Sequence, residues 1–239
     1  MRKALEADPG SSNAHNGLGD LHYARHAWQE ARSEYATAIE LNPSSAAAHT
    51  SLASLLIILG RFDEAEAELR RAMQLNPLWY GPQLNLAELY YYARRYDQSF
   101  EAAKAMDQRF PGQFGGFMMA KARKRQGRNA EAARLMAGLP VGESPLLRAL
   151  KAIYTGDRET ALAVRDSANK KKDFLPAWLR ATISMEMGDR EQTIAWLEKS
   201  LIAGDPDLCS LNVDPLFDPI RNDPRCQRIL SQLNLPASK

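Results

Sequence analysis

The chain has 239 residues and is rich in alanine (36) and leucine (30), with only 3 valines, 9 isoleucines and 6 threonines. Helices favour alanine and leucine whereas strands favour β-branched residues, so this composition excludes a large sheet. The net charge of +2 is too small to indicate a nucleic-acid-binding surface, and the longest apolar run, Leu52–Leu59, is too short to span a membrane. Two cysteines cannot form a disulfide framework. We therefore expect a helical cytoplasmic protein.

A period of 34 residues runs along the chain, with prolines at positions 9, 43, 77, 111 and 145. The residues before these prolines repeat as well, since Ala4-Leu-Glu-Ala-Asp-Pro9 resembles Ala38-Ile-Glu-Leu-Asn-Pro43 and Ala72-Met-Gln-Leu-Asn-Pro77. A second landmark is a glycine followed by polar residues, found at Gly60, Gly127, Gly156 and Gly188. A fixed period of this length indicates a repeated supersecondary unit.

Each period is predicted to contain two helices. In the second period, apolar residues at i, i+3, i+4 and i+7 mark a first helix, at Leu52, Leu55, Leu56 and Leu59. Gly60 then ends that helix, as glycine often does after a C-cap. A second apolar stripe begins at Phe62, and Pro77 ends it because proline cannot continue a helix. Antiparallel helix pairs repeated in this way stack into a solenoid.

These residues resemble the tetratricopeptide repeat, whose pattern spaces Leu-Gly or Leu-Ala, tyrosine, alanine, an aromatic residue and proline at fixed intervals. The matching positions are Leu18, Gly19, Ala31, Tyr35, Ala38, Pro43, Leu52, Ala53, Leu56, Ala65, Leu69, Ala72, Pro77, Leu86, Ala87, Tyr90 and Pro111. The resemblance implies an all-α, right-handed superhelical solenoid of antiparallel helix pairs. The small residues at Gly19, Ala53 and Ala87 would then let the paired helices approach closely.

The pattern divides the chain into four parts. Residues 1–11 correspond to the trailing helix of a truncated repeat, residues 12–112 to three well-matched repeats, and residues 113–205 to three degenerate helix pairs. Residues 206–239 form a C-terminal cap. We expect one elongated array, and further repeats or another domain before Met1, because an orphan helix would leave an apolar face exposed.

Asp-Pro occurs four times at the boundary of the expected cap and within it, beginning at Asp205, Asp214, Asp218 and Asp223. Aspartate is a good N-cap and proline suits the first helical position, so each pair can start a short helical turn. The last pair predicts a helix over about residues 224–233, and the apolar residues of the cap are expected to cover the sixth repeat. Residues 214–230 also resemble the closing segment of repeat arrays in bacterial signalling proteins and transcriptional regulators.

No pattern for catalysis or cofactor binding is found in the sequence. His22 and His26 share a helix face, but no cysteine near them completes a metal site. Cys209 and Cys226 have no histidine beside them in the sequence, and the chain lacks a phosphate-binding glycine loop and a Gly-x-Ser-x-Gly elbow. We expect no enzyme activity, no metal and no cofactor.

The predicted binding surface is the concave groove, which the first helix of each repeat lines in this family. An apolar and aromatic strip with polar edges suits a peptide or helix anchored by a few side chains. Transferring the register gives the candidate residues Asn13, Asn16, Asp20, Tyr23, Thr50, Ser54, Ile57, Ile58, Leu84, Asn85, Glu88, Tyr91, Tyr92, Phe114, Phe117, Lys121, Lys124 and Arg125.

Two features of this surface allow a second interpretation. Tyr91, Tyr92, Phe114 and Phe117 can instead pack between neighbouring repeats, as aromatic stripes on helices usually do. The basic cluster of residues 121–128 can hold an acidic partner segment or form a solvated helix face.

Three functions are consistent with this sequence. The first is a non-catalytic scaffold that binds a peptide or protein segment in the groove. The second is a ligand-sensing or self-associating regulatory domain of a larger bacterial transcription or signalling protein, and the third is an accessory region of an enzyme. The expected partner is a protein or peptide, without nucleic acid or membrane, and a homo-oligomer is compatible with the sequence.

Overall fold

The computed structural model describes residues 10–112, 114–140, 144–166 and 175–235. These residues form helices and contain no strand, which confirms the all-α prediction. The trailing helix expected within residues 1–11 lies almost entirely outside the described residues. The helices are α2 (Ser12–Tyr23), α3 (Trp28–Leu41), α4 (Ala46–Ile58), α5 (Phe62–Leu75), α6 (Gly81–Tyr92), α7 (Tyr96–Arg109), α8 (Gly115–Arg125), α9 (Asn129–Ala137), α10 (Pro145–Thr155), α11 (Arg158–Asp166), α12 (Ala177–Glu186), α13 (Arg190–Ala203), η1 (Pro206–Asn212), η2 (Pro215–Phe217), α14 (Asp218–Arg221) and α15 (Pro224–Gln232).

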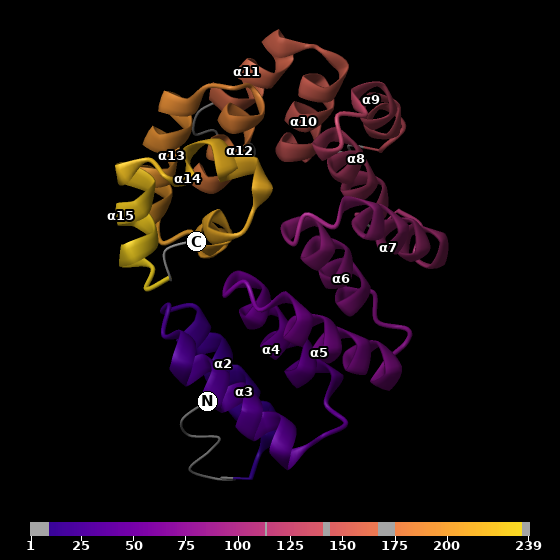
Figure 1. Ribbon diagram of the computed structural model, residues 1–239, viewed down its shortest axis with the longest axis vertical. Helices are drawn as coiled ribbons and strands as arrows, with labels where there is room; N and C mark the ends of the chain where they lie inside the picture. The colour runs from indigo at the N-terminus through magenta and orange to yellow at the C-terminus, as the bar shows by residue number, and fades with distance from the viewer. Residues whose placement is uncertain (1–9, 113, 141–143, 167–174, 236–239) are drawn as a thin grey trace.

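Within the described residues, the helices from α2 to α13 form six consecutive antiparallel pairs that stack into a superhelix (Figure 1). The first helix of every pair contributes to the inner face, and the second helix packs behind it. Helix α9 has 9 residues, against 14 in each of α3, α5 and α7.

Small residues let the two helices of a pair lie close together. The residues predicted for this role, Gly19, Ala53 and Ala87, are all buried, and so are Ala31, Ala65 and Ser99 on the second helices. Gly19 is the most constrained, because a Cβ atom there would lie 2.4 Å from Cε1 of Tyr35. Since carbon atoms pack at about 3.5–4.0 Å, only glycine fits at this crossing.

The turn within each pair uses one residue with a left-handed backbone. Gly60 (φ 74°) and Gly127 (φ 74°) take this conformation as predicted. The same place is occupied by His26 (φ 56°) and Arg94 (φ 61°), each 34 residues from Gly60. The turn geometry is therefore retained without glycine, at a strain of about 1–2 kcal/mol per residue.

The C-terminal cap consists of short helical turns, most of which begin at an Asp-Pro pair. The Asp214 carboxylate accepts a hydrogen bond from the Leu216 N–H, and Asp223 caps α15 by accepting from the Arg225 N–H. The Arg221 guanidinium donates to the carbonyl of Leu211 (3.0 Å) and to that of Asp214 (2.6 Å). One buried arginine thus holds the turns of the cap together.

The cap packs on the sixth helix pair, as predicted. The ring centroids of Trp178 in α12 and Phe217 in η2 lie 4.9 Å apart. Arg225 in α15 forms an ion pair of 2.8 Å with Glu191 in α13. The cap residues expected to cover this pair are all buried: Leu216, Phe217, Ile220, Cys226, Ile229 and Leu230.

The prediction of an elongated array is wrong, because the cap also reaches the first three helix pairs and closes the superhelix into a ring (Figure 1). The indole N–H of Trp28 donates to the Leu233 carbonyl at 2.8 Å. The Asn212 amide donates to the Ile58 carbonyl at 2.9 Å. The apolar residues of the cap are numerous enough to be buried on two sides, against α12 and α13 and against the N-terminal pairs. Closure therefore removes apolar surface that an open array would expose to water.

Candidate functional site

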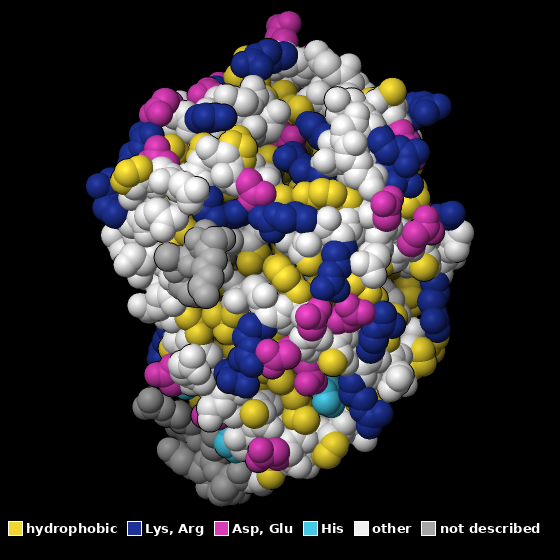
Figure 2. Space-filling model, in the orientation of Figure 1, with side chains coloured by type: hydrophobic (Ala, Val, Ile, Leu, Met, Phe, Trp, Pro, Cys, Tyr) yellow, Lys and Arg dark blue, Asp and Glu magenta, His cyan; other side chains and the backbone are white. Residues whose placement is uncertain are grey.

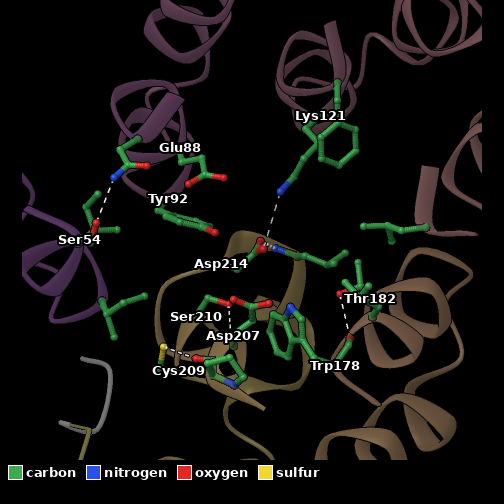
Figure 3. A pocket seen from close by; sticks show the side chains of 18 of the residues that line it. Ser54, Glu88, Tyr92, Lys121, Trp178, Thr182, Asp207, Cys209, Ser210 and Asp214 are labelled. Carbon is green, nitrogen blue, oxygen red and sulfur yellow. Dashed lines mark hydrogen bonds and ion pairs between the residues drawn. The ribbon is translucent and has the colours of Figure 1, made fainter. Parts of the chain in front are cut away.

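A cavity of about 400 Å³ lies at the centre of the ring, between the inner helices and the cap (Figure 3). Its walls come from α2, α4, α6, α8, α10 and α12, together with η1 and η2. Figure 2 shows hydrophobic side chains in the middle of this face, with lysine and arginine side chains beside them. Both ends of the described chain therefore contribute to a single site.

Half of the predicted groove residues line this cavity. They are Tyr23, Ser54, Ile57, Ile58, Asn85, Glu88, Tyr92, Phe117 and Lys121. The inner helices place these side chains on one face because the residues recur at the helical spacing of the repeat. Their contact with a partner stays a prediction.

The other nine predicted residues lie outside the cavity. Thr50 and Tyr91 are buried, and Tyr91 packs with its neighbours between repeats, as the second interpretation of the aromatic residues holds. Lys124 and Arg125 are both paired with Glu186. The other five residues lie away from the cavity and are exposed or partly buried. They are Asn13, Asn16, Asp20, Leu84 and Phe114.

Sequence reasoning missed the contributions of α10, α12 and the cap. Part of this signal was present, because Glu88, Lys121, Tyr154 and Glu186 stand at steps of 33, 33 and 32 residues. The cap residues carry no such signal, since the cap lies outside the repeat. The missed lining residues are Leu146, Leu150, Tyr154, Trp178, Leu179, Thr182, Glu186, Pro206, Asp207, Cys209, Ser210, Asp214 and Leu216.

The basic side chains of α8 meet acidic groups of the same chain. Lys124 Nζ lies 2.6 Å from one oxygen of Glu186, and Arg125 Nη2 lies 2.9 Å from the other. Lys121 Nζ lies 4.0 Å from Asp214 in the cap. Lys124 and Arg125 therefore link the fourth helix pair to the sixth, and Lys121 lies between the cavity and the cap.

Two carboxylates of the cavity wall have no such cation. Among the described residues, the side chains of Glu88 and Asp207 have no hydrogen bond or ion pair. Burial raises the pKa of Glu88, with Lys121 opposing the shift and the Asp214 and Asp207 carboxylates adding to it. Burial and the neighbouring Asp205 raise the pKa of Asp207. Within the described part of the chain, neither carboxylate therefore has a cation within ion-pair distance, and Asp207 is exposed while Glu88 is partly exposed.

The thiol of Cys209 in the cavity wall is a weak nucleophile. Burial raises the pKa of the Cys209 thiol to about 11, so that it stays protonated at neutral pH. Its sulfur contacts the Tyr23 hydroxyl at 3.6 Å. The described residues contain no group of three or more side chains that could hold a metal ion, and no described helix combines the length and apolarity needed to cross a membrane.

The sequence model of the tetratricopeptide repeat matches residues 1–37 and 18–78. By sequence, residues 1–78 thus match the tetratricopeptide repeat, and the helix pairs after them continue the same fold. No curated protein matches the sequence of this chain. The family forms scaffolds for protein–protein interaction, and this chain has the architecture of such a scaffold.

Solved structures extend the likeness in fold over nearly the whole chain. A tetratricopeptide repeat protein of Parabacteroides merdae has a TM-score of 0.63 and 16% identity, covering 98% of this chain and 89% of that one. Yeast Tom70 has a TM-score of 0.58 and 16% identity, covering 97% of this chain and 52% of that one. YrrB, described as having an unusual peptide-binding site, has a TM-score of 0.50 and 15% identity, covering 87% of this chain and 94% of that one.

Proposed function

We propose that this protein binds a short segment of a partner protein in the central cavity. The observation that carries the proposal is the cavity itself, which is walled by all six inner helices and by the cap. A volume of about 400 Å³ is within the usual range for binding pockets in proteins. The fold likeness to YrrB, for which a peptide-binding site is described, is consistent with a peptide occupant.

The size of the cavity limits what can bind. The cap already occupies much of the inner face that an open superhelix would offer to a ligand. One turn of an α-helix, about 10 Å wide and 5.4 Å long, has a volume of about 400 Å³. The cavity therefore suits three or four side chains, such as a loop tip or a chain terminus, in place of a long helix.

The wall combines apolar and polar groups in the way a peptide anchor requires. Ile57, Ile58 and Leu150 provide apolar surface, and Asn85 and Thr182 provide groups for hydrogen bonds. A few anchoring side chains of a partner would contribute most of the affinity in such a site.

Peptide display tests this proposal. Random peptides are selected on the wild-type chain, and their affinities are measured for Thr182→Trp, which fills the cavity, and Ser33→Trp, which adds the same bulk on the exposed outer helix α3. We expect selected peptides to bind the wild type and Ser33→Trp alike and to lose at least about tenfold in affinity for Thr182→Trp. Circular dichroism checks that both variants are folded. Peptides that bind all three proteins equally would overturn the proposal.

A second candidate is ligand sensing, because one cavity is walled by both ends of the described chain. Tyr23 of α2 and Cys209 of the cap meet across it. An occupant that contacts both sides would favour the closed ring over an open one. Amide hydrogen exchange in α15 tests this, since a sensed ligand should slow exchange there and a ligand held by the inner helices alone should not.

A further inference from the structure

The charged groups of the cavity wall are unevenly compensated. Glu186 is held by two cations of α8, and Asp214 lies near Lys121 and accepts a hydrogen bond from a backbone N–H. Among the described residues, Glu88 and Asp207 have no ion pair and no hydrogen-bond donor, and Lys121 acts on Glu88 from beyond ion-pair distance. The region between α6 and η1 is therefore the acidic part of the cavity.

Aromatic rings accompany these two carboxylates. Figure 3 shows Glu88 beside Tyr92 on the α6 side of the cavity, and Asp207 near Trp178 on the cap side. Rings of this kind attract cations to their faces, as the Lys121 ammonium does at 5.6 Å from the centroid of Phe117. Carboxylates and aromatic faces together favour a positive group over a neutral or negative one.

We infer that the acidic part of the cavity, formed by Glu88, Asp207, Tyr92 and Trp178, binds the positively charged side chain of a lysine or arginine in the partner segment. This inference rests on the proposed function, to which it adds the chemistry of the anchoring residue. An ammonium or guanidinium group would supply the donors that both carboxylates lack, and its aliphatic stem would lie against apolar surface of the cavity. An acidic segment would be repelled by the same two groups.

Isoleucine methyl NMR of the full chain tests the inference. Ile57 and Ile58 report on the cavity wall, and Ile202, which is 87% exposed on α13, reports on a distant surface. The probes are Nα-acetyl-lysine N-methylamide, the corresponding arginine compound, and the uncharged norleucine compound of nearly the same shape. We expect the two cationic probes to shift the signals of Ile57 and Ile58 at concentrations about tenfold below those at which norleucine does, without shifting Ile202.

Substitutions identify the groups responsible. Glu88→Gln and Asp207→Asn keep the size of each side chain and remove its charge. Each should lower the affinity for the lysine probe about tenfold. Glu101→Gln, which makes the same change on the exposed face of α7, should leave the affinity unchanged. The Ile202 signal and the dispersion of the methyl spectrum show whether a variant is folded. Equal affinity of wild type, Glu88→Gln and Asp207→Asn would overturn the inference.

The pH dependence supplies a second readout. The groups facing Glu88 are Lys121 on α8 and the carboxylates of Asp214 and Asp207 in the cap. Because the pKa values of Glu88 and Asp207 are raised, acidification neutralises them before ordinary surface carboxylates, while the lysine probe stays charged. The affinity should therefore begin to fall at a pH above the ordinary carboxyl pKa of about 4.3, and an affinity that stays constant down to about pH 4 would contradict the inference.

The outcomes separate the inference from the proposed function. Displayed peptides that lose affinity for Thr182→Trp but bind equally well after lysine or arginine is replaced by norleucine would uphold the cavity as a peptide site and overturn the cationic anchor. If 1,5-diaminopentane binds more tightly than any lysine-containing peptide, the cation is a free amine and the inference of a lysine or arginine side chain is wrong. Selectivity for lysine or arginine over norleucine, lost in both carboxamide variants, supports the inference.

Discussion

The hydrogen bond between Trp28 and Leu233 provides a direct test of ring closure. Trp28 is the first residue of α3 and is 5% exposed. Its ring packs edge-on against that of Tyr23, with the ring centroids 5.3 Å apart. Its indole N–H donates to the Leu233 carbonyl at 2.8 Å, across 205 residues of sequence. Trp28→Phe keeps an aromatic ring at this position but removes the donor.

The size of the effect follows from the burial of both partners. Leu233 is 1% exposed, so its carbonyl cannot readily bind water once the indole is absent. An unsatisfied buried acceptor destabilises the folded state by about 1–3 kcal/mol. The smaller ring adds a packing loss. Trp196→Phe is the matched control, because its indole nitrogen is buried without a partner among the described residues. The control therefore loses ring volume without losing a hydrogen bond.

Urea denaturation followed by circular dichroism measures the free energy of unfolding for both variants. We expect Trp28→Phe to be less stable than Trp196→Phe by about 1–3 kcal/mol. For a chain of this length, each kcal/mol corresponds to a difference of about 2–4 °C in Tm. Amide exchange in α15 should accelerate in Trp28→Phe alone, because the bond holds that end of the cap. Equal destabilisation, with unchanged exchange in α15, would refute the view that this bond stabilises the closed ring.

Three further predictions concern packing and charge. Gly19→Ala should lower the free energy of unfolding by about 1–3 kcal/mol, because the added methyl group meets Tyr35. Gly138→Ala is the control and should be neutral, since the atoms nearest to its added methyl group lie at 3.6 Å or more. Urea titration compares the two variants, and equal effects would contradict the close crossing at Gly19. Ala65→Leu should also lower it by about 1–3 kcal/mol through overpacking, and an unchanged melting curve would argue against the helix register. Glu88→Gln should raise Tm at neutral pH, because burial raises the pKa of the carboxyl and the folded state then holds its proton more tightly than the unfolded state does. That gain should fade as the pH falls through the raised pKa towards the usual value of about 4.3, and a gain that is constant with pH would contradict it.

Much of the local structure could be predicted from the sequence. The 34-residue step of the prolines and the glycine at position 60 locate the helix pairs, because helix ends depend on residues within a few positions. Buried Ala53 and Ala65 follow from the same register. The turns at His26 and Arg94 escaped prediction, since neither residue type favours the left-handed conformation that the stacking imposes there.

The candidate site was only half predictable. The repeat register brings Ile57, Glu88 and Lys121 to the inner face, since each repeat presents the same helix positions to it. The register does not reveal which inner residues are covered by, or paired with, other parts of the same chain. Lys124 and Arg125, predicted to face a partner, bind Glu186 some 60 residues away, and no local pattern records that pairing.

The sequence by itself determined the units of this protein: helix pairs that repeat along the chain, close crossings at small residues, and a cap with helical turns at its Asp-Pro pairs. Only the tertiary structure decided that these units close into a ring. Curvature in a solenoid accumulates from small rotations between neighbouring repeats, and no single repeat specifies their sum. The accumulated rotation brings Asn212 of the cap to Ile58, 154 residues earlier in the chain. The cavity with its unpaired carboxylates lies between the inner helices and the cap, so it exists only in the closed ring.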